Sequence, residues 1–303
     1  MPAYLLYAIT VAIWGSSWYA MELQLVLPFE QAVAYRYVLA TAILVCFCLA
    51  TGRSLRFSRQ DHLYMAGQGF FLFGINYLLF YWAADYLASG LLAVCFSTIT
   101  VMNLANGALF FRHRIDPLVA VAALLGLVGI GLVFWPEVAA VEANGDALLG
   151  LGLSLIATYA ASIGNMITVR HKAAGVPVME GNAMGMAYGA LFNVAVVFAM
   201  GAPLQFALTP SFLGSLVYLA LFASVIGFGC YLTLVERIGA DRAAYASVLF
   251  PVVALGVSTA LEGYRWTLPA AFGVALVLAG NLLVLTRRHI HPRAKLVQES
   301  IAS

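Results

Sequence analysis

The chain alternates between long apolar runs and short polar segments. Charged residues, proline and glycine delimit ten apolar runs, which cover residues 4–21, 29–50, 63–84, 88–111, 117–135, 147–169, 178–200, 211–235, 243–262 and 267–286. Most of these runs reach about 20 residues, the length at which a helix crosses a hydrocarbon core about 30 Å thick. A helix satisfies its own backbone hydrogen bonds, and the runs lack the alternating pattern of a membrane barrel. The pattern predicts an all-α polytopic membrane protein with about ten transmembrane helices.

Composition supports a chain that lies in lipid. Of its 303 residues, 63% are hydrophobic and 9% are charged, whereas soluble domains carry about 25% charged residues. The first run has no basic residue before it and no cleavage site after it, so we expect it to be retained. The cysteines lie inside apolar runs without Cys-x-x-Cys spacing, and we expect no disulfide framework, no metal site and no cofactor. The sequence contains no nucleic-acid-binding patch, and the expected partners are a small-molecule substrate and membrane lipid.

The distribution of basic residues predicts the orientation of the helices. Lysine and arginine accumulate in cytoplasmic loops, and with the N-terminus inside, the outer loops hold only Arg265. The inner segments then contain Arg53, Arg56, Arg59, Arg112, Arg114, Arg170, Lys172, Arg237, Arg242, Arg287, Arg288, Arg293 and Lys295, while the outer loops carry Glu137, Glu142 and Asp146. We therefore expect a multi-pass protein of a bacterial-type inner membrane with both termini cytoplasmic, and residues 287–303 as a cytoplasmic basic tail.

The two halves of the sequence resemble each other at a shift of roughly 150 residues. Pro117 then corresponds to Pro269, and the segment that begins at Ala88 corresponds to the one that begins at Ala240. Five spans in each half is an odd number, so the second half enters the membrane from the opposite side. We expect two inverted five-helix repeats at 1–135 and 147–286, with a site between them. Chance similarity among apolar segments is the alternative.

Several short motifs resemble the drug/metabolite transporter superfamily, in its EamA-type ten-helix branch, over almost the whole chain. The motifs are Ile13-Trp14-Gly15-Ser16-Ser17, Tyr35-Arg36-Tyr37-Val38-Leu39-Ala40, and the helix from Ala243 to Pro251 with its central proline, followed by Leu261-Glu262-Gly263. The first half departs from this pattern at the corresponding positions, Ile99 and Phe110. The resemblance implies secondary transport of small organic molecules, with exporters of amino acids, aromatic amino acids among them, as the nearest branch. Multidrug or lipophilic-cation transport and nucleotide-sugar transport are the alternatives.

The third span presents a polar and aromatic face. Tyr77 and Tyr81 lie one helical turn apart, and Asn76 and Phe80 occupy the adjoining strip. Side chains of this kind at membrane depth could bind a solute, because polar groups are costly in hydrocarbon and tend to be functional. Aromatic packing and an interfacial belt explain them as well.

Three further spans contribute candidate substrate-binding residues. The fourth span contains Ser97, Thr98, Thr100, Asn103 and Asn106, the sixth contains Tyr159, Ser162 and Asn165, and the first contains Trp14, Ser16, Ser17 and Trp18. Each group could line a cavity. Hydrogen bonds between helices, worth about 0.6 kcal/mol each in membrane bundles, account for the polar residues equally well.

Arg36 is the one basic residue inside a predicted span, and it lies roughly 10 Å from the start of its helix at 1.5 Å per residue. It could attract a substrate carboxylate, or form a switching pair with Glu22 or Glu30. A static ion pair and snorkelling to the interface are the alternatives. Pro251 removes one backbone hydrogen bond in the middle of its span, which predicts either a hinge or a static bend.

Other classes of function find less support in the sequence. All five histidines fall in loops or in the tail, so we expect no histidine-based catalytic or metal site at membrane depth and no enzymatic activity. No phosphate-binding loop indicates a primary pump. The acidic residues cluster at helix ends, which favours facilitated diffusion or exchange over proton coupling. A channel is a further alternative, and the sequence leaves the oligomeric state open.

Overall fold

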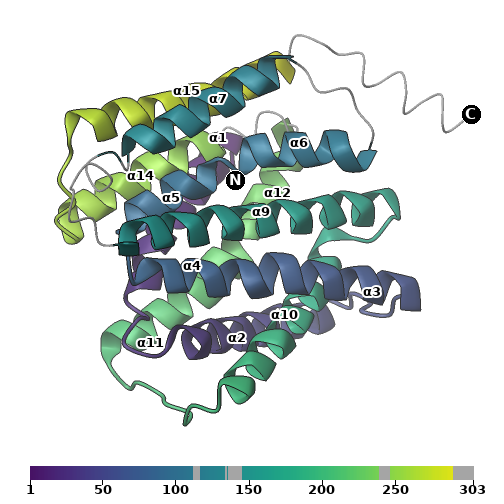
Figure 1. Cartoon of the computed structure of the whole chain (residues 1–303). Helices are drawn as coiled ribbons and strands as arrows, with labels where there is room; N and C mark the ends of the chain where they lie inside the picture. Colours follow the sequence, from purple (N-terminus) through teal and green to yellow (C-terminus); the bar gives the residue numbers. More distant parts are fainter. Residues whose placement is uncertain (112–116, 134, 136–144, 239–245, 289–303) are drawn as a thin grey trace, which may run out of the picture.

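The computed structural model describes residues 1–111, 117–133, 135, 145–238 and 246–288. All regular elements of this described part are helical (Figure 1). The first half contains α1 (Ala3–Glu22), α2 (Phe29–Ala50), α3 (Arg59–Gln68), η1 (Gly69–Ile75), α4 (Asn76–Ala84), α5 (Ser89–Ser97), α6 (Ile99–Phe111) and α7 (Pro117–Val133). The second half contains α9 (Gly145–Ala173), α10 (Val178–Met200), α11 (Pro210–Val217), η2 (Tyr218–Ile226), α12 (Gly227–Ile238), α14 (Ala246–Leu261) and α15 (Leu268–Arg288).

These elements join into ten helical units that match the ten predicted spans. The third unit is α3–η1–α4, the fourth is α5–α6, and the eighth is α11–η2–α12. Within the described part of the chain, six helical stretches have the length and composition to cross a membrane, and three shorter helices are also apolar. The predicted all-α polytopic class is confirmed. Several charges used to predict orientation lie outside the described residues, namely Arg112, Arg114, Glu137, Glu142, Arg242, Arg293 and Lys295, as do His113, Ala240, Ala243 and the predicted tail beyond Arg288.

The two halves pack reciprocally. In the first half α1 contacts α12 and α14, and in the second half the equivalent helix α9 contacts α4, α5 and α6. The second helix of each half, α2 and α10, pack together, and so do the fifth helices, α7 and α15. Figure 1 shows α9 lying across the first half, between α4 and α5, and α7 and α15 side by side along one edge. The largest contacts between the halves thus have counterparts under exchange of the two, as two oppositely oriented repeats require.

A π-helical segment interrupts the third unit of each half at the same position. The segments are η1 and η2, and within them Phe73 and Ala223 stand 150 residues apart (223 minus 73). Each contributes a backbone carbonyl to a side-chain donor from another helix: Asn193 Nδ2 reaches Phe73 O at 3.1 Å, and Trp14 Nε1 reaches Ala223 O at 3.4 Å. Both donors belong to the opposite half. A side chain inserted into the backbone ladder is a known companion of such bulges, so the halves stabilise each other's irregular turns.

The fourth unit is broken at Thr98, between α5 and α6. This position is equivalent to the vicinity of Pro251, which lies inside the continuous helix α14. In place of a proline, Ser97 Oγ donates to Val94 O at 2.7 Å and Thr98 Oγ1 donates to Cys95 O at 2.7 Å. Hydroxyl groups that bond back to the preceding turn bend helices. The hydroxyl groups of Ser97 and Thr98 therefore account for the break in the fourth unit. The sequence pattern did not predict this break, because Ile99 stands where the proline of the second half would fall.

Glycines permit the closest approach between halves, where α7 crosses α15. A Cβ atom on Gly273 would lie 2.4 Å from Gly129 O, and one on Gly129 would lie 2.6 Å from Gly273 O. Gly280 is also tight, with Ala122 O at 2.8 Å from its Cβ position, whereas Gly126 and Gly131 have nothing within 4 Å. Gly129, Gly273 and Gly280 therefore permit the close packing of α7 on α15, whereas a side chain at Gly126 or Gly131 would meet open space.

Candidate functional site

An aromatic cluster fills the seam between the halves. It consists of Trp18 of α1, Phe80 of α4, Phe96 of α5 and Phe250 of α14, which we call the seam cluster. The Trp18 ring centroid lies 5.1 Å from that of Phe80 and 5.6 Å from that of Phe96. Phe96 lies 6.0 Å from Phe250 of the second half. Phe80 and Phe250 are buried, so the four rings form an apolar wall to which both halves contribute.

Trp14 lies one turn from Trp18 on α1 and faces the eighth unit. Its ring packs on Phe228 at 5.4 Å and on Tyr231 at 5.1 Å between centroids. Ser17 Oγ donates to Trp14 O at 2.8 Å, within its own helix. The hydroxyl that bridges the seam here is Ser16, 2.7 Å from the Tyr218 hydroxyl. Trp14 and Trp18 therefore lie at the seam, whereas Ser17 bonds to its own helix; substrate binding by these three residues stays a prediction.

A second cluster surrounds Arg36, which is 4% exposed. The guanidinium carbon lies 4.5 Å from the ring centroid of Tyr77 and 5.4 Å from that of Tyr37. Arg36 Nη1 donates to the Tyr81 hydroxyl at 3.5 Å, and that hydroxyl donates to Gln24 Oε1. We call these five residues, from α2, α4 and the segment that joins α1 to α2, the arginine cluster. Gln24 is fully buried.

Arg36 does not take part in an ion pair in the described residues. The two pairs found there are Arg53–Glu180 at 3.1 Å and Arg170–Asp61 at 2.8 Å. The static ion pair considered for Arg36 is therefore not formed among the described residues, and the side chain is enclosed by protein. Its Nε atom is buried without a hydrogen-bond acceptor among the described residues. A switching pair with Glu22 or Glu30 stays a prediction.

The remaining predicted residues divide into three groups. Asn76 is buried at the start of α4. Ser97 and Thr98 bond to their own helix, and Ser162 accepts a hydrogen bond of 2.9 Å from Asn106 Nδ2, which joins α6 to α9. Tyr159 is 45% exposed on α9, between buried neighbours, and lies outside both clusters. Its helix presents Thr158 and Ser162 to the protein instead, because a single step along a helix turns a side chain through about 100°.

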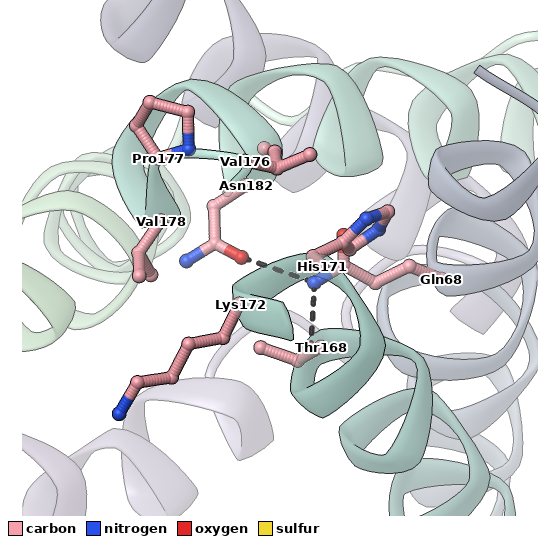
Figure 2. A pocket seen from close by; sticks show the side chains of 9 residues that line it. Gln68, Thr168, His171, Lys172, Val176, Pro177, Val178 and Asn182 are labelled. Atoms are coloured by element: carbon pink, nitrogen blue, oxygen red, sulfur yellow. Dashed lines mark hydrogen bonds between the residues drawn. The ribbon is translucent and has the colours of Figure 1, made fainter. Parts of the chain in front are cut away.

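The sixth and seventh units meet the third in a polar cluster, shown in Figure 2. Gln68 Nε2 donates to Thr168 Oγ1 at 2.9 Å and to Asn182 Oδ1 at 3.1 Å. His171, 4% exposed, lines the same small hollow, and both of its ring nitrogens lack hydrogen-bond partners in the described part of the chain. The two ion pairs described above lie at the same end of the bundle: Arg53, in the connection between α2 and α3, pairs with Glu180 of α10, and Arg170 of α9 pairs with Asp61 of α3. We call this the basic end of the bundle.

Other contacts between halves close the opposite end. Gln31 Nε2 donates to Pro203 O at 3.0 Å, and Gln31 Oε1 accepts from Gln205 N at 2.8 Å. Glu262 Oε2 accepts from Ser89 N at 3.0 Å, which places a carboxylate on the N-terminus of α5, where the helix dipole favours negative charge. Two small hollows among the described residues, one at the basic end and one lined by Leu44, Met186 and Phe228, each have room for about one water molecule. Contacts between the halves are thus present at both ends of the bundle, which is a closed arrangement.

Sequence reasoning missed Gln24, Phe96 and Phe250 as members of these clusters. Gln24 stands in a short connection between helices, where a polar residue gives no signal. Phe96 and Phe250 are aromatic residues among many in apolar spans. Within the described residues, no group of three or more His, Cys, Asp or Glu side chains could hold a metal ion.

Comparison with known proteins identifies relatives over almost the whole chain. The model of the EamA-like transporter family matches residues 1–135 and 148–286. The PagO protein of Salmonella typhimurium is 22% identical over 293 residues, which cover 94% of this chain and 95% of PagO. An uncharacterized transporter of Archaeoglobus fulgidus is 24% identical, with 95% and 100% covered. One solved crystal structure superposes with a TM-score of 0.65 at 18% identity, and the match covers 94% of this chain and 98% of the other.

Proposed function

The chain belongs to the EamA-like transporter family, and from this premise we propose that it exports small metabolites, with amino acids as the substrate class. In this proposal solute crosses at the seam between the two halves by alternating access. The protein works in a bacterial-type inner membrane with both termini in the cytoplasm, as the basic residues favour.

One observation carries the mechanism, namely that equivalent contacts close both ends of the bundle. Glu180 at the start of α10 binds Arg53, in the connection that follows α2. Gln31 at the start of α2 binds Pro203 and Gln205, in the connection that follows α10. Two inverted repeats give a carrier two related gates on opposite sides of one site. Breaking one set of contacts while the other holds exposes the seam to one side of the membrane.

The chemistry of the seam favours a solute with an apolar or aromatic part and polar groups. The seam cluster supplies flat apolar surface, and Ser16 and Tyr218 supply hydroxyls beside it. Aromatic rings bind other rings by stacked or edge-on contacts. The buried positive charge of Arg36, which contacts Tyr77 and Tyr81 of α4, disfavours a lipophilic cation, which is why amino acids rank above multidrug transport.

Counterflow in proteoliposomes tests the proposal. Vesicles loaded with unlabelled amino acid should accumulate the labelled amino acid through the purified protein, with no imposed pH gradient, whereas protein-free vesicles should not. Lipophilic cations and nucleotide sugars complete the panel, and uptake of either in place of amino acids would assign the chain to that class. Flux without saturation or counterflow would indicate a channel. Strict dependence on a pH gradient would refute facilitated exchange.

A matched pair of variants links transport to the seam. Trp18→Leu removes the ring that contacts Phe80 and Phe96, and we expect counterflow to fall. Trp266→Leu removes an equally large ring that is 46% exposed in the connection before α15, and we expect transport to be unchanged. Equal transport by both variants would exclude the seam cluster as the path of the solute.

A further inference from the structure

The arginine cluster contains a buried positive charge with no anionic partner in the described residues. Arg36 is enclosed on α2 and faces two rings and one hydroxyl, all of them neutral. Burial of a cation is unfavourable unless an opposite charge and hydrogen bonds compensate for the lost water. Rings attract the charge weakly, and the one hydrogen bond to Tyr81 is long at 3.5 Å. The Nε–H of Arg36 remains without an acceptor.

Gln24 supplies a second unused donor to the same cluster. Arginine can only donate, so the oxygen of Tyr81 accepts from Arg36 and its single proton goes to the oxygen of Gln24. That arrangement fixes the orientation of the Gln24 amide. The Nε2 group of Gln24 then points away from the Tyr81 hydroxyl. This group has no acceptor in the part of the chain that the structure describes, although Gln24 is fully buried.

The two residues that carry these unused donors, Arg36 and Gln24, both bond to the hydroxyl of Tyr81 through their other atoms, and one of the unused donors is charged. The group that complements them is negatively charged and accepts hydrogen bonds without donating any, and a carboxylate has both properties. A planar carboxylate also matches the fork of a guanidinium, which can bind it through two parallel hydrogen bonds. The rings of Tyr37 and Tyr77 lie against the guanidinium and restrict its rotation, so its N–H groups are already oriented before a carboxylate binds.

We propose that Arg36, Gln24 and Tyr81 form a carboxylate-binding subsite, and that the transported solute bears a carboxylate. This inference rests on the proposed transport of amino acids and assigns which part of the solute the protein recognises. The subsite lies on α2 and α4, and α4 also provides Phe80 to the seam cluster. The carboxylate binds the arginine cluster while the rest of the solute lies against the aromatic wall. The closed seam opens to admit it.

Competition between acids and their amides tests this assignment in transport. In counterflow of labelled L-phenylalanine or L-alanine, the unlabelled amino acid should inhibit uptake at a concentration about tenfold or more lower than its carboxamide does. This difference is the size expected for one charge-assisted hydrogen bond. Arg36→Gln should abolish this preference by weakening the acid alone. Gln24→Leu should reduce it, and Arg36→Lys should restore part of it. Arg265→Gln, the same change at an exposed arginine in the connection between α14 and α15, should leave the preference intact.

A measurement that does not depend on transport keeps the two proposals separate. Potassium acetate, compared with potassium chloride at equal ionic strength, should raise the melting temperature of the wild-type protein in detergent and should not raise that of Arg36→Gln. If no amino acid is transported but this acetate shift is found, the proposed function fails and the carboxylate subsite stands. An equal shift with chloride would make it a general anion site and overturn the assignment. So would equal competition by acids and amides, or a folded Arg36→Gln protein that keeps the wild-type preference.

Discussion

The crossing of α7 and α15 predicts a large effect from one methyl group. Replacement of Gly273 by alanine places a Cβ atom 2.4 Å from Gly129 O and 2.7 Å from Val133 Cγ2. The first of these neighbours is backbone and cannot rotate away. An ordinary contact of about 3.5 Å requires the two helices to separate by roughly 1 Å. A gap of that size forfeits up to about half of the dispersion energy along the contact, so we expect a loss of about 1–3 kcal/mol in the free energy of unfolding.

Gly131 provides the matched control for this change. It lies on α7, two residues from the crossing, and nothing would lie within 4 Å of its Cβ atom. Alanine there adds the same methyl group without a clash, and helix propensity makes the change neutral or favourable by up to about 1 kcal/mol. Reversible unfolding of both purified variants in mixed micelles of mild detergent and sodium dodecyl sulfate measures the difference. If Gly273→Ala proved as stable as Gly131→Ala, the close backbone contact between the halves would be refuted.

Three further predictions concern contacts that join the halves. Asn193→Leu leaves Phe73 O without its donor inside the bundle, and unfolding measurements should show a loss of about 1–3 kcal/mol; an unchanged stability would mean that the π-helical turn needs no donor. Glu262→Leu should cost about 1 kcal/mol more than Glu262→Gln, since glutamine keeps an acceptor for Ser89 N, and equal costs would contradict the capping role. Arg53→Gln leaves the mostly buried carboxylate of Glu180 unpaired, so a double-mutant cycle with Glu180→Gln should give a coupling of about 0.5–3 kcal/mol, whereas simple additivity would show that the pair does not hold this end closed.

The helical units could be predicted from sequence because lipid imposes a strong rule. Every backbone group must be paired within its segment, so apolar runs between Phe29 and Ala50 or between Val178 and Met200 have one solution, and their ends agree with the structure. The break at Thr98 was not predictable in the same way. It depends on hydroxyls that bond to the preceding turn, and serine and threonine sit in many straight helices.

Residues of the candidate site were harder to predict. The periodicity of a helix shows which side chains share a face, but it does not show which other helix packs against that face. Tyr77 and Tyr81 were expected to share a surface, and they do so around Arg36. Charge alone suggested Glu22 or Glu30 as the partner of Arg36, whereas the folded chain surrounds it with phenol rings. Tyr159 has the same residue type as Tyr77 but faces outward. Which side of a helix meets protein depends on the crossing of the two halves, which no single span encodes.

The exchange of hydrogen bonds at Phe73 and Ala223 bears on how the protein is made. A ribosome delivers the first five helical units before the donor Asn193 exists, so the carbonyl of Phe73 waits in the growing chain without the side chain that later satisfies it. Trp14 is synthesised among the first residues, and its indole N–H likewise lacks the carbonyl of Ala223 until that residue is added more than two hundred residues later. Each half therefore depends on the other for a hydrogen-bond donor to its π-helical segment. A truncated product would leave one of these carbonyl groups without its donor, and we expect membrane proteases to degrade such a product.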